Sequence, residues 1–217
     1  MKQIILSFFI VLSFFEVKGQ KIEPKFTFNV ELGLPVALAN TPFNDVMQGL
    51  VGVSIYQQYS FPFHLNVGLG ARYSLFTIDE FAVPDFVNGS MHTTGAFLKV
   101  GYDKFITEIF AIDFGVKLGY SLNFSSTREN DAEGDIIKRT NLQNESIHIE
   151  PTLGLILLAD EKTSFRFTIG YDIQGTGFSP RFIGLNSDSN WDPNRYNSPT
   201  QYLVVGFGFT YYFRKDK

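Results

Sequence analysis

Ser90 and His92 place a hydroxyl and an imidazole two positions apart, the residue types of a serine nucleophile and its general base. Side chains two apart on a β-strand point to the same face. A third group must orient the histidine, and Glu80 and Asp85 precede the pair as acidic candidates. The spacing therefore predicts a candidate hydrolytic site, with an ordinary pair of loop residues as the alternative.

A second candidate lies near the C-terminus. The stretch DSNWD, with Asp188, Asn190 and Asp192 at alternate positions, has the D-x-N-x-D spacing that opens a calcium loop. Pro193 stands where an EF-hand requires glycine and no glutamate closes the loop, so an EF-hand is excluded. A looser surface calcium site is the remaining metal hypothesis, here or at the acidic run 131–135. Turn formation explains the same residue types, and we expect no metal or other cofactor.

Charged residues also occur inside otherwise apolar segments. Asp113 and Lys117 are four positions apart, about 13 Å along a strand, so they cannot pair with each other. Partners must come from other strands. Eight charged residues, four acidic and four basic, lie on the polar face of the apolar segments. They are Glu31, Arg72, Lys99, Asp113, Lys117, Glu150, Arg166 and Asp172. An equal count suits a buried network, which His64 and His148 would join by their position in the alternation.

The elements that carry these residues have a period of two, whereas the helical period of 3.6 is hard to find. Each segment has roughly 10 to 14 residues, longer than an ordinary soluble strand and sufficient for a tilted membrane crossing. Their even number is typical of bacterial single-chain barrels. The predicted strands cover residues 26–38, 49–59, 63–75, 93–102, 109–124, 146–158, 163–174 and 202–213.

The connections between these strands alternate between long and short. All long loops then lie at one end, and the short turns and both termini lie at the other. Outer-membrane barrels have short periplasmic turns and longer extracellular loops. The sequence therefore predicts an all-β, eight-stranded antiparallel up-and-down transmembrane barrel with periplasmic termini.

Three features favour a membrane barrel over a soluble one. Many of the 19 glycines fall on the polar face, which suits a crowded interior better than a solvated surface. The polar face carries balanced charges, and the apolar face carries none. Of the 24 Phe and 10 Tyr residues, ten lie near the short turns, as in the aromatic girdle of such barrels.

The N-terminus resembles a secretory signal peptide. Lys2 precedes an apolar run that is too short to cross a bilayer, and small residues follow it. We therefore expect a signal peptide at residues 1–20 and one barrel domain at 21–217. The chain has no cysteine, so no disulfide framework is expected. Its net charge is −4 and the sequence contains no basic patch, which argues against a nucleic-acid partner.

The signal end "VKGQ" and the closing strand "YLVVGFGFTYYF" resemble those of small eight-stranded outer-membrane barrels of the PorT-like/OmpX-like, Bacteroidota type. The resemblance implies an outer-membrane location and insertion by the barrel-assembly machinery. It also implies that Phe213 is the assembly signal, although four further residues follow it. It implies no enzymatic activity.

The combined pattern predicts a structural or surface-interaction protein that acts through its extracellular loops, with its interior closed by paired charges. Expected partners are outer-membrane lipid, lipopolysaccharide and an unidentified extracellular or periplasmic protein. One alternative is a lipid A-modifying enzyme that uses Ser90 and His92 on the lipid-facing surface. Another is a narrow channel or an accessory component of a secretion or assembly machine. The last-loop aromatics either form a contact patch or pack the loop on itself; they are Phe178, Phe182, Trp191 and Tyr196.

Overall fold

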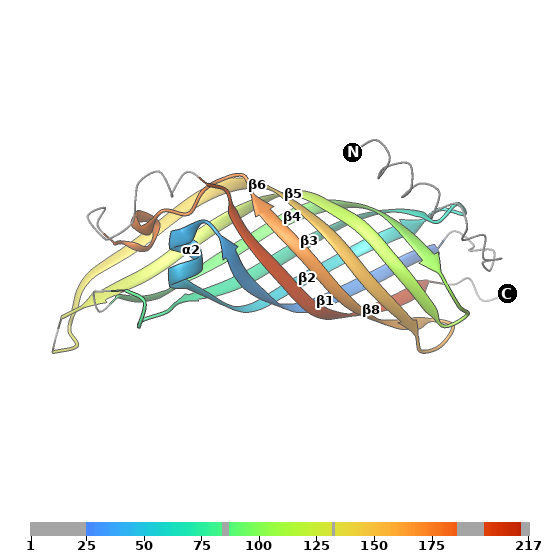
Figure 1. Ribbon diagram of the computed structural model, residues 1–217, viewed down its shortest axis with the longest axis horizontal. Coiled ribbons are helices and arrows are strands. Elements are labelled where there is room, and N and C mark those ends of the chain that lie inside the picture. The colour runs from blue at the N-terminus through green and yellow to red at the C-terminus, as the bar shows by residue number, and fades with distance from the viewer. Residues whose placement is uncertain (1–24, 84–86, 132, 186–197, 214–217) are drawn as a thin grey trace, which may run out of the picture.

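The computed structural model describes residues 25–83, 87–131, 133–185 and 198–213. Eight strands form a closed barrel in which sequence neighbours pair antiparallel and β1 closes the ring against β8 (Figure 1). Among these residues, no helix has both the length and the apolar character needed to span a bilayer. The predicted eight-stranded up-and-down architecture is confirmed. The strands are β1 (Lys25–Ala39), β2 (Met47–Ser60), β3 (Leu65–Ile78), β4 (Val87–Phe105), β5 (Phe110–Asn130), β6 (Ile136–Leu158), β7 (Thr163–Gln174) and β8 (Thr200–Phe213).

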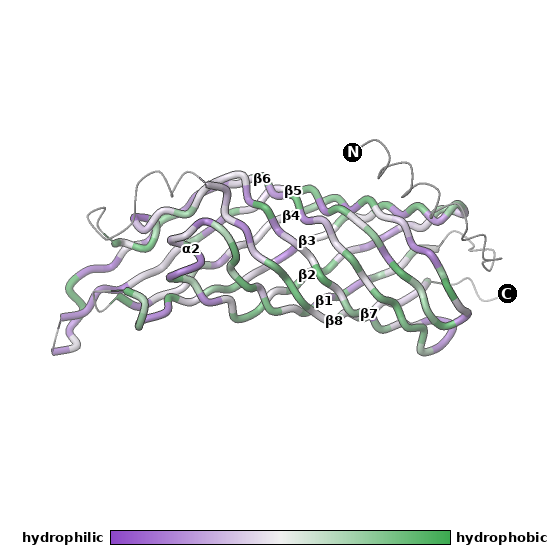
Figure 2. The backbone as a smooth tube through the Cα atoms, in the orientation of Figure 1, coloured by the Kyte–Doolittle hydropathy of each residue, from purple (hydrophilic) through white to green (hydrophobic). Residues whose placement is uncertain are grey.

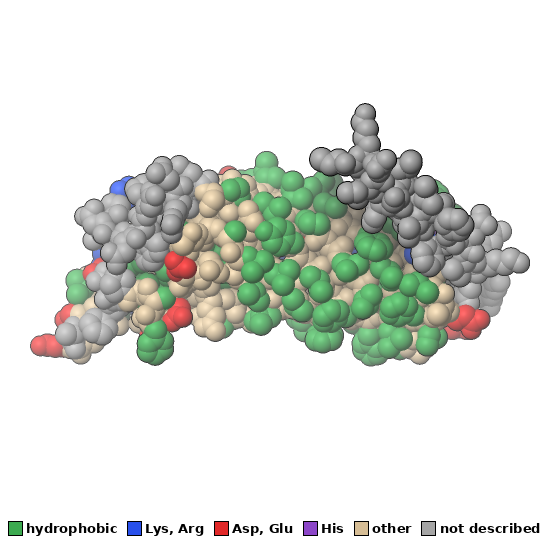
Figure 3. All heavy atoms as spheres, viewed as in Figure 1, with side chains coloured by type: hydrophobic (Ala, Val, Ile, Leu, Met, Phe, Trp, Pro, Cys, Tyr) green, Lys and Arg blue, Asp and Glu red, His purple; other side chains and the backbone are tan. Residues whose placement is uncertain are grey.

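The outer wall of the barrel is apolar. On β5, Phe114 and Leu118 are exposed, whereas Asp113 and Lys117 are buried on the opposite face. Hydrophobic and hydrophilic residues alternate along the strands (Figure 2), and hydrophobic side chains cover the visible wall from the end with the termini to the middle (Figure 3). This arrangement is the reverse of a soluble barrel and matches the outward apolar band of membrane barrels.

Both termini of the barrel lie at the end with the tight turns, which we call the short-turn end (Figure 1). In the turn before β7, Asp160 accepts hydrogen bonds from the Thr163 hydroxyl at 2.6 Å and from the Lys162 and Thr163 backbone N–H groups at 2.7 and 2.8 Å. These bonds, led by the Thr163 hydroxyl, lower the pKa of the Asp160 carboxyl. An aromatic row borders this end: Phe26–Tyr59, Tyr59–Phe61 and Phe61–Phe63 have ring centroids 5.0, 4.9 and 5.4 Å apart.

At the opposite, long-loop end, β5 and β6 reach farther than the sequence predicts (Figure 1). The predicted boundaries at residues 124 and 146 are wrong, because the two strands stay paired to Asn130 and Ile136. The predicted long loop between them is a tight turn. Both faces of this extension are largely polar, so it carries no hydrophobic alternation that would mark it as strand. β4 likewise begins at Val87, ahead of the predicted residue 93.

Loop segments fold into the barrel mouth at the long-loop end. The helix α2 (Thr41–Val46) begins at Asn40, whose side chain accepts from the Phe43 N–H at 3.2 Å, and Pro42 occupies its first turn. The 3-10 helix η1 (Pro180–Ile183) covers the same mouth. Their buried residues pack with strand and loop residues in what we call the mouth cluster: Phe43, Val46, Met47, Phe76, Ile78, Val83, Val87, Met91, Phe178, Ile183, Leu185 and Tyr202.

The inner wall has little space beside its large side chains. A Cβ at Gly70 would lie 2.4 Å from the Tyr56 Cβ and 2.4 Å from the Ile55 carbonyl oxygen. A Cβ at Gly119 would lie 2.4 Å from Cε1 of His148. Glycine at these positions is therefore a packing requirement of the narrow interior.

We predict that Gly70→Leu lowers the free energy of unfolding by at least about 1–3 kcal/mol, the usual cost of overpacking a full core. Urea unfolding of the folded barrel in detergent micelles measures this. The control is Ala71→Leu, because Ala71 is the next residue along β3 and is exposed on the outer face. Equal stability of the two variants would contradict a filled interior.

Candidate functional site

The interior holds all eight charged residues that the alternation places there, and each is buried. They come from β1 and β3 to β7, so they face one another across the lumen. Register alone places Lys117 opposite Glu150 on the neighbouring strand. We call this set, with the tyrosines that join it below, the ion network.

Arg72 is the centre of one half of the ion network. Its guanidinium contacts Glu150 at 3.0 Å and also bonds Asp172 and the hydroxyl of Tyr202. Gln174 Nε2 donates to the other oxygen of Asp172 at 2.7 Å. An arginine that is shared by two carboxylates satisfies the requirement that buried charges be paired and hydrogen-bonded.

Asp113 is the centre of the other half. Its Oδ2 accepts from Lys99 Nζ at 2.7 Å and from Arg166. Lys117 connects the two halves, since its Nζ lies 2.9 Å from Glu31 and 3.1 Å from Glu150. No pair joins Asp113 to Lys117, as their spacing predicts.

Tyr56 joins Glu31 to the Asp113 half. Its hydroxyl donates to Glu31 at 2.6 Å and accepts from Arg166 at 3.1 Å and from Lys99 at 3.5 Å. Phe97 adds an aromatic face, with the Lys117 Nζ 5.3 Å from its ring centroid. With Tyr56 on β2 and Tyr202 on β8, every strand contributes to the interior set.

Sequence reasoning missed these aromatic members and one acid. Tyr56, Phe97 and Tyr202 lie on the inward parity, so the alternation itself is the sequence signal that locates them. The prediction that Asp103 lies in a turn is wrong: it lies on β4 and is the register partner of Asp113. The strand β4 continues to Phe105 beyond the predicted boundary at residue 102.

The two inward-parity histidines differ in position. His148 is fully buried and its Nδ1 lies 2.8 Å from the Ser121 hydroxyl, within the interior. His64 instead lies in the turn before β3, with φ of 69°, and its ring packs 5.7 Å from that of Tyr102. His148 is therefore fully inside the barrel, whereas His64 is partly exposed at the short-turn end.

Two cavities within the described interior are small. One is lined by residues of the ion network, including Glu31, Arg72, Lys117 and Glu150, and has a volume of about 20 Å³. A second, beneath the mouth cluster and bordered by Phe178, also measures about 20 Å³. Each has room for about one water molecule.

The structure brings Ser90 and His92 together on β4. The Ser90 hydroxyl lies 3.0 Å from His92 Nε2, and the Tyr73 hydroxyl on β3 lies 2.7 Å from His92 Nδ1. All three are partly exposed, and the third group is a tyrosine instead of either predicted acid. Glu80 is exposed beyond the end of β3, while Asp85 lies outside the described residues.

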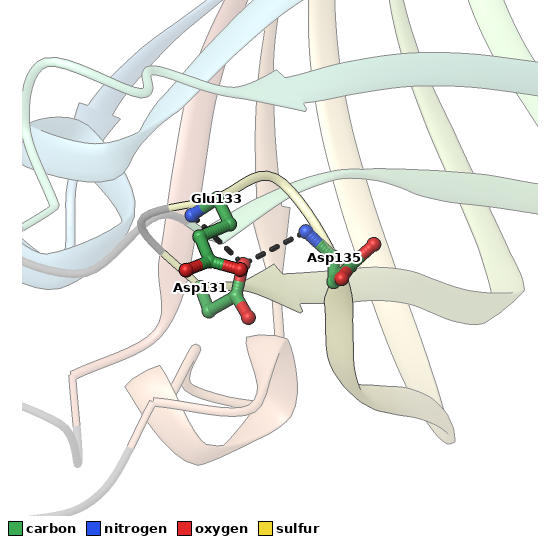
Figure 4. A group of neighbouring side chains, drawn as sticks. All are labelled: Asp131, Glu133 and Asp135. Atoms are coloured by element: carbon green, nitrogen blue, oxygen red, sulfur yellow. Dashed lines mark hydrogen bonds between the residues drawn. The ribbon is translucent and has the colours of Figure 1, made fainter.

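The acidic run at the β5–β6 turn forms a compact group (Figure 4). One oxygen from each of Asp131, Glu133 and Asp135 lies within 4.8 Å of the others. Asp131 Oδ1 accepts from the N–H groups of Glu133 at 3.0 Å and Asp135 at 2.8 Å, which is the bonding of a capped turn. The other calcium candidates, Asp188, Asn190 and Asp192, lie outside the described residues.

The aromatic residues of the last connection are divided. Phe178 is buried in the mouth cluster, 5.5 Å from the Phe43 ring, and Phe182 lies 6.4 Å from Phe178. These two pack the loop into the barrel mouth instead of forming an exposed patch. Trp191 and Tyr196 lie outside the described residues.

The predicted assembly residue, Phe213, is the last residue of β8. It pairs in register with Phe26, its ring lies 5.2 Å from Tyr211, and it is exposed on the outer wall.

We predict that Glu150→Gln lowers the free energy of unfolding by about 3 kcal/mol or more, because Arg72 and Lys117 lose a buried counter-charge. Denaturant unfolding in micelles measures the change, and Glu150→Gln combined with Lys117→Met recovers part of it. The exposed Glu145 on the same strand provides the control, Glu145→Gln, with a change within about 0.5 kcal/mol. An equally small loss for Glu150→Gln would contradict a coupled network.

The sequence matches no family model, and no curated protein matches it. Solved structures share its architecture. A major outer membrane protein from Thermus thermophilus has a TM-score of 0.57 and 14% identity, over 88% of this chain and 100% of that one. Neisserial surface protein A gives 0.48 and 12% over 87% and 97%, and Ail of Yersinia pestis, in complex with the heparin analogue sucrose octasulfate, gives 0.46 and 10% over 87% and 99%. The likeness to the Thermus protein supports an outer-membrane type of barrel fold.

Proposed function

We propose that this protein is an integral outer-membrane barrel with a structural or surface-interaction role, and that its interior is closed to solutes. The observation that carries the proposal is the ion network, which joins residues from all eight strands across the lumen. Eight-stranded barrels have interiors only just wide enough for side chains, in contrast to porins with 16 to 18 strands. An interior filled in this way favours an activity located on the outside of the barrel.

The outer wall supports the membrane assignment. Exposed apolar residues such as Leu69, Leu98 and Phe207 would form an aggregation-prone surface in water, but they match the hydrocarbon region of a bilayer. The aromatic row at the short-turn end suits a membrane interface. A signal peptide at residues 1–20, which lies outside the described residues, would direct the chain to the periplasm. The barrel would then insert into the outer membrane from the periplasmic side.

By the general orientation of such barrels, the short-turn end is periplasmic and the long-loop end is extracellular. The β5–β6 extension then stands beyond the apolar belt, where its polar faces meet water. Its acidic turn would contact lipopolysaccharide through divalent ions or bind an extracellular protein. Phe213 would present the aromatic signal for the barrel-assembly machinery.

Cysteine labelling tests the orientation, since the natural chain contains no cysteine. We expect Glu133→Cys, in the exposed β5–β6 turn, to react with a membrane-impermeant maleimide on intact cells. Glu108→Cys, exposed at the short-turn end, reacts only after permeabilisation. The reverse pattern would contradict the orientation, and recovery of the protein in the soluble fraction would contradict the membrane assignment.

A second candidate function is supported by the Ser90–His92–Tyr73 hydrogen bonds. With His92 Nε2 accepting the Ser90 proton, the serine oxygen can attack an ester carbonyl of a membrane lipid such as lipid A. Nδ1 then carries the other proton and donates to the Tyr73 oxygen, which would orient the ring. The ester C–O bond would then break, and the lipid alcohol would leave with the proton from Nε2. Water would hydrolyse the acyl-serine, releasing a fatty acid and restoring the Ser90 hydroxyl.

For this candidate function, we expect Ser90→Ala and His92→Ala each to abolish the loss of one acyl chain in lipid A mass spectra of expressing cells. Ser126→Ala is the matched control, because Ser126 is the register partner of Ser90 and is exposed on β5. A lipid A profile that is unchanged by expression of the natural protein would rule out this candidate.

Two finer predictions lie beyond these observations. One is membership of the PorT-like, Bacteroidota-type group. The other is a role as an accessory component of a secretion or assembly machine, or as a narrow channel. Both stay predictions. Co-purification from native outer membranes would identify such a machine through its other subunits.

A further inference from the structure

The described interior holds one more carboxylate than it has cationic groups. Asp103 on β4 joins the four acids and four bases of the ion network, and its Oδ1 is buried without a hydrogen-bonding partner in the protein. It lies in register with Asp113, whose Oδ1 is also unpartnered. A buried carboxylate must be paired, bound to an ion or protonated to be tolerated, so the excess calls for a cation or a shared proton.

Two amide side chains lie beside this carboxylate pair. Gln58 Nε2 donates to Asp103 Oδ2 at 3.2 Å, which leaves its own Oε1 buried and unpartnered. Asn66, on the strand between them, is fully buried, and neither its Oδ1 nor its Nδ2 has a partner in the protein. Gly101 makes room for this amide: a Cβ there would lie 2.6 Å from Asn66 Oδ1.

These four residues, Gln58, Asn66, Asp103 and Asp113, form what we call the short-turn polar cluster. They come from four adjacent strands, and each offers one buried oxygen that no protein donor occupies. Lys99 and Arg166 both bond Oδ2 of Asp113, which leaves its Oδ1 without a hydrogen-bonding partner. Unsatisfied polar groups at this density call for a specific explanation such as a bound ion.

We propose that the short-turn polar cluster binds one monovalent cation of the size of sodium. The donors are carboxylate and amide oxygens, which select hard cations over transition metals. One missing positive charge favours a monovalent ion, because a divalent ion would leave the interior with an excess of positive charge. The bound ion would hold β2, β3, β4 and β5 together at the short-turn end.

The test uses the purified, folded barrel in detergent. Its unfolding temperature is measured at mildly alkaline pH as sodium chloride replaces N-methyl-glucamine chloride at constant ionic strength. Because an ion that binds only the folded state stabilises it, we expect the midpoint to rise by a few degrees with sodium. The Asp103→Asn variant loses this rise, whereas Glu108→Gln, an exposed carboxylate at the same end, retains it.

Each other outcome has a definite meaning. Equal midpoints in the two salts, with a midpoint that falls as pH rises, would show that the two carboxylates share a proton and would overturn the cation site. A sodium response that survives in a folded Asp103→Asn variant would also overturn it. If that variant does not fold, crystals of the natural protein soaked in thallium(I) decide: we expect an anomalous peak among the four side chains, and a peak only elsewhere contradicts the proposal. None of these results depends on the cellular location of the barrel.

Discussion

The narrow lumen of an eight-stranded barrel is the constraint on which the other features of this protein depend. Such a lumen is only as wide as the side chains that fill it, so an inward-facing charge has no water to solvate it and must meet an opposite charge. Arg72, Asp113 and Lys117 each contact two partners for this reason. Large side chains in turn require glycines opposite them. A Cβ at Gly170 would lie 2.5 Å from a Glu150 oxygen.

The same constraint divides the interior into layers of different chemistry. Uncharged and acidic groups occupy the short-turn end, the ion network crosses the middle, and the apolar mouth cluster closes the long-loop end. Tyr202 joins the last two layers, because its hydroxyl bonds Arg72 while its ring packs 5.2 Å from Phe76. The helix α2 adds Phe43 to this junction, 5.1 Å from the Phe76 ring. The barrel is thus closed by polar and apolar contacts that share residues.

Alternation in the sequence predicted the barrel and placed eight charged residues on one face of its strands, because burial on one face of a strand imposes a period of two. It was insufficient where a segment carries no apolar face. The β5–β6 extension is polar on both sides, and α2 is too short to show a helical period. Asp103 lies outside the predicted interior because the predicted strand ends at residue 102, whereas β4 continues to Phe105. The pairing of Arg72 with Asp172 joins strands that are not neighbours, and no register argument reveals it.

The central claim is that the interior is closed by its own side chains while the outer wall faces lipid. Conductance of the reconstituted barrel across a planar bilayer tests this claim most directly. Closure predicts no discrete current steps under applied voltage when folded insertion is verified by heat-modifiable electrophoretic mobility. Stable, ohmic steps from the folded natural protein would contradict it.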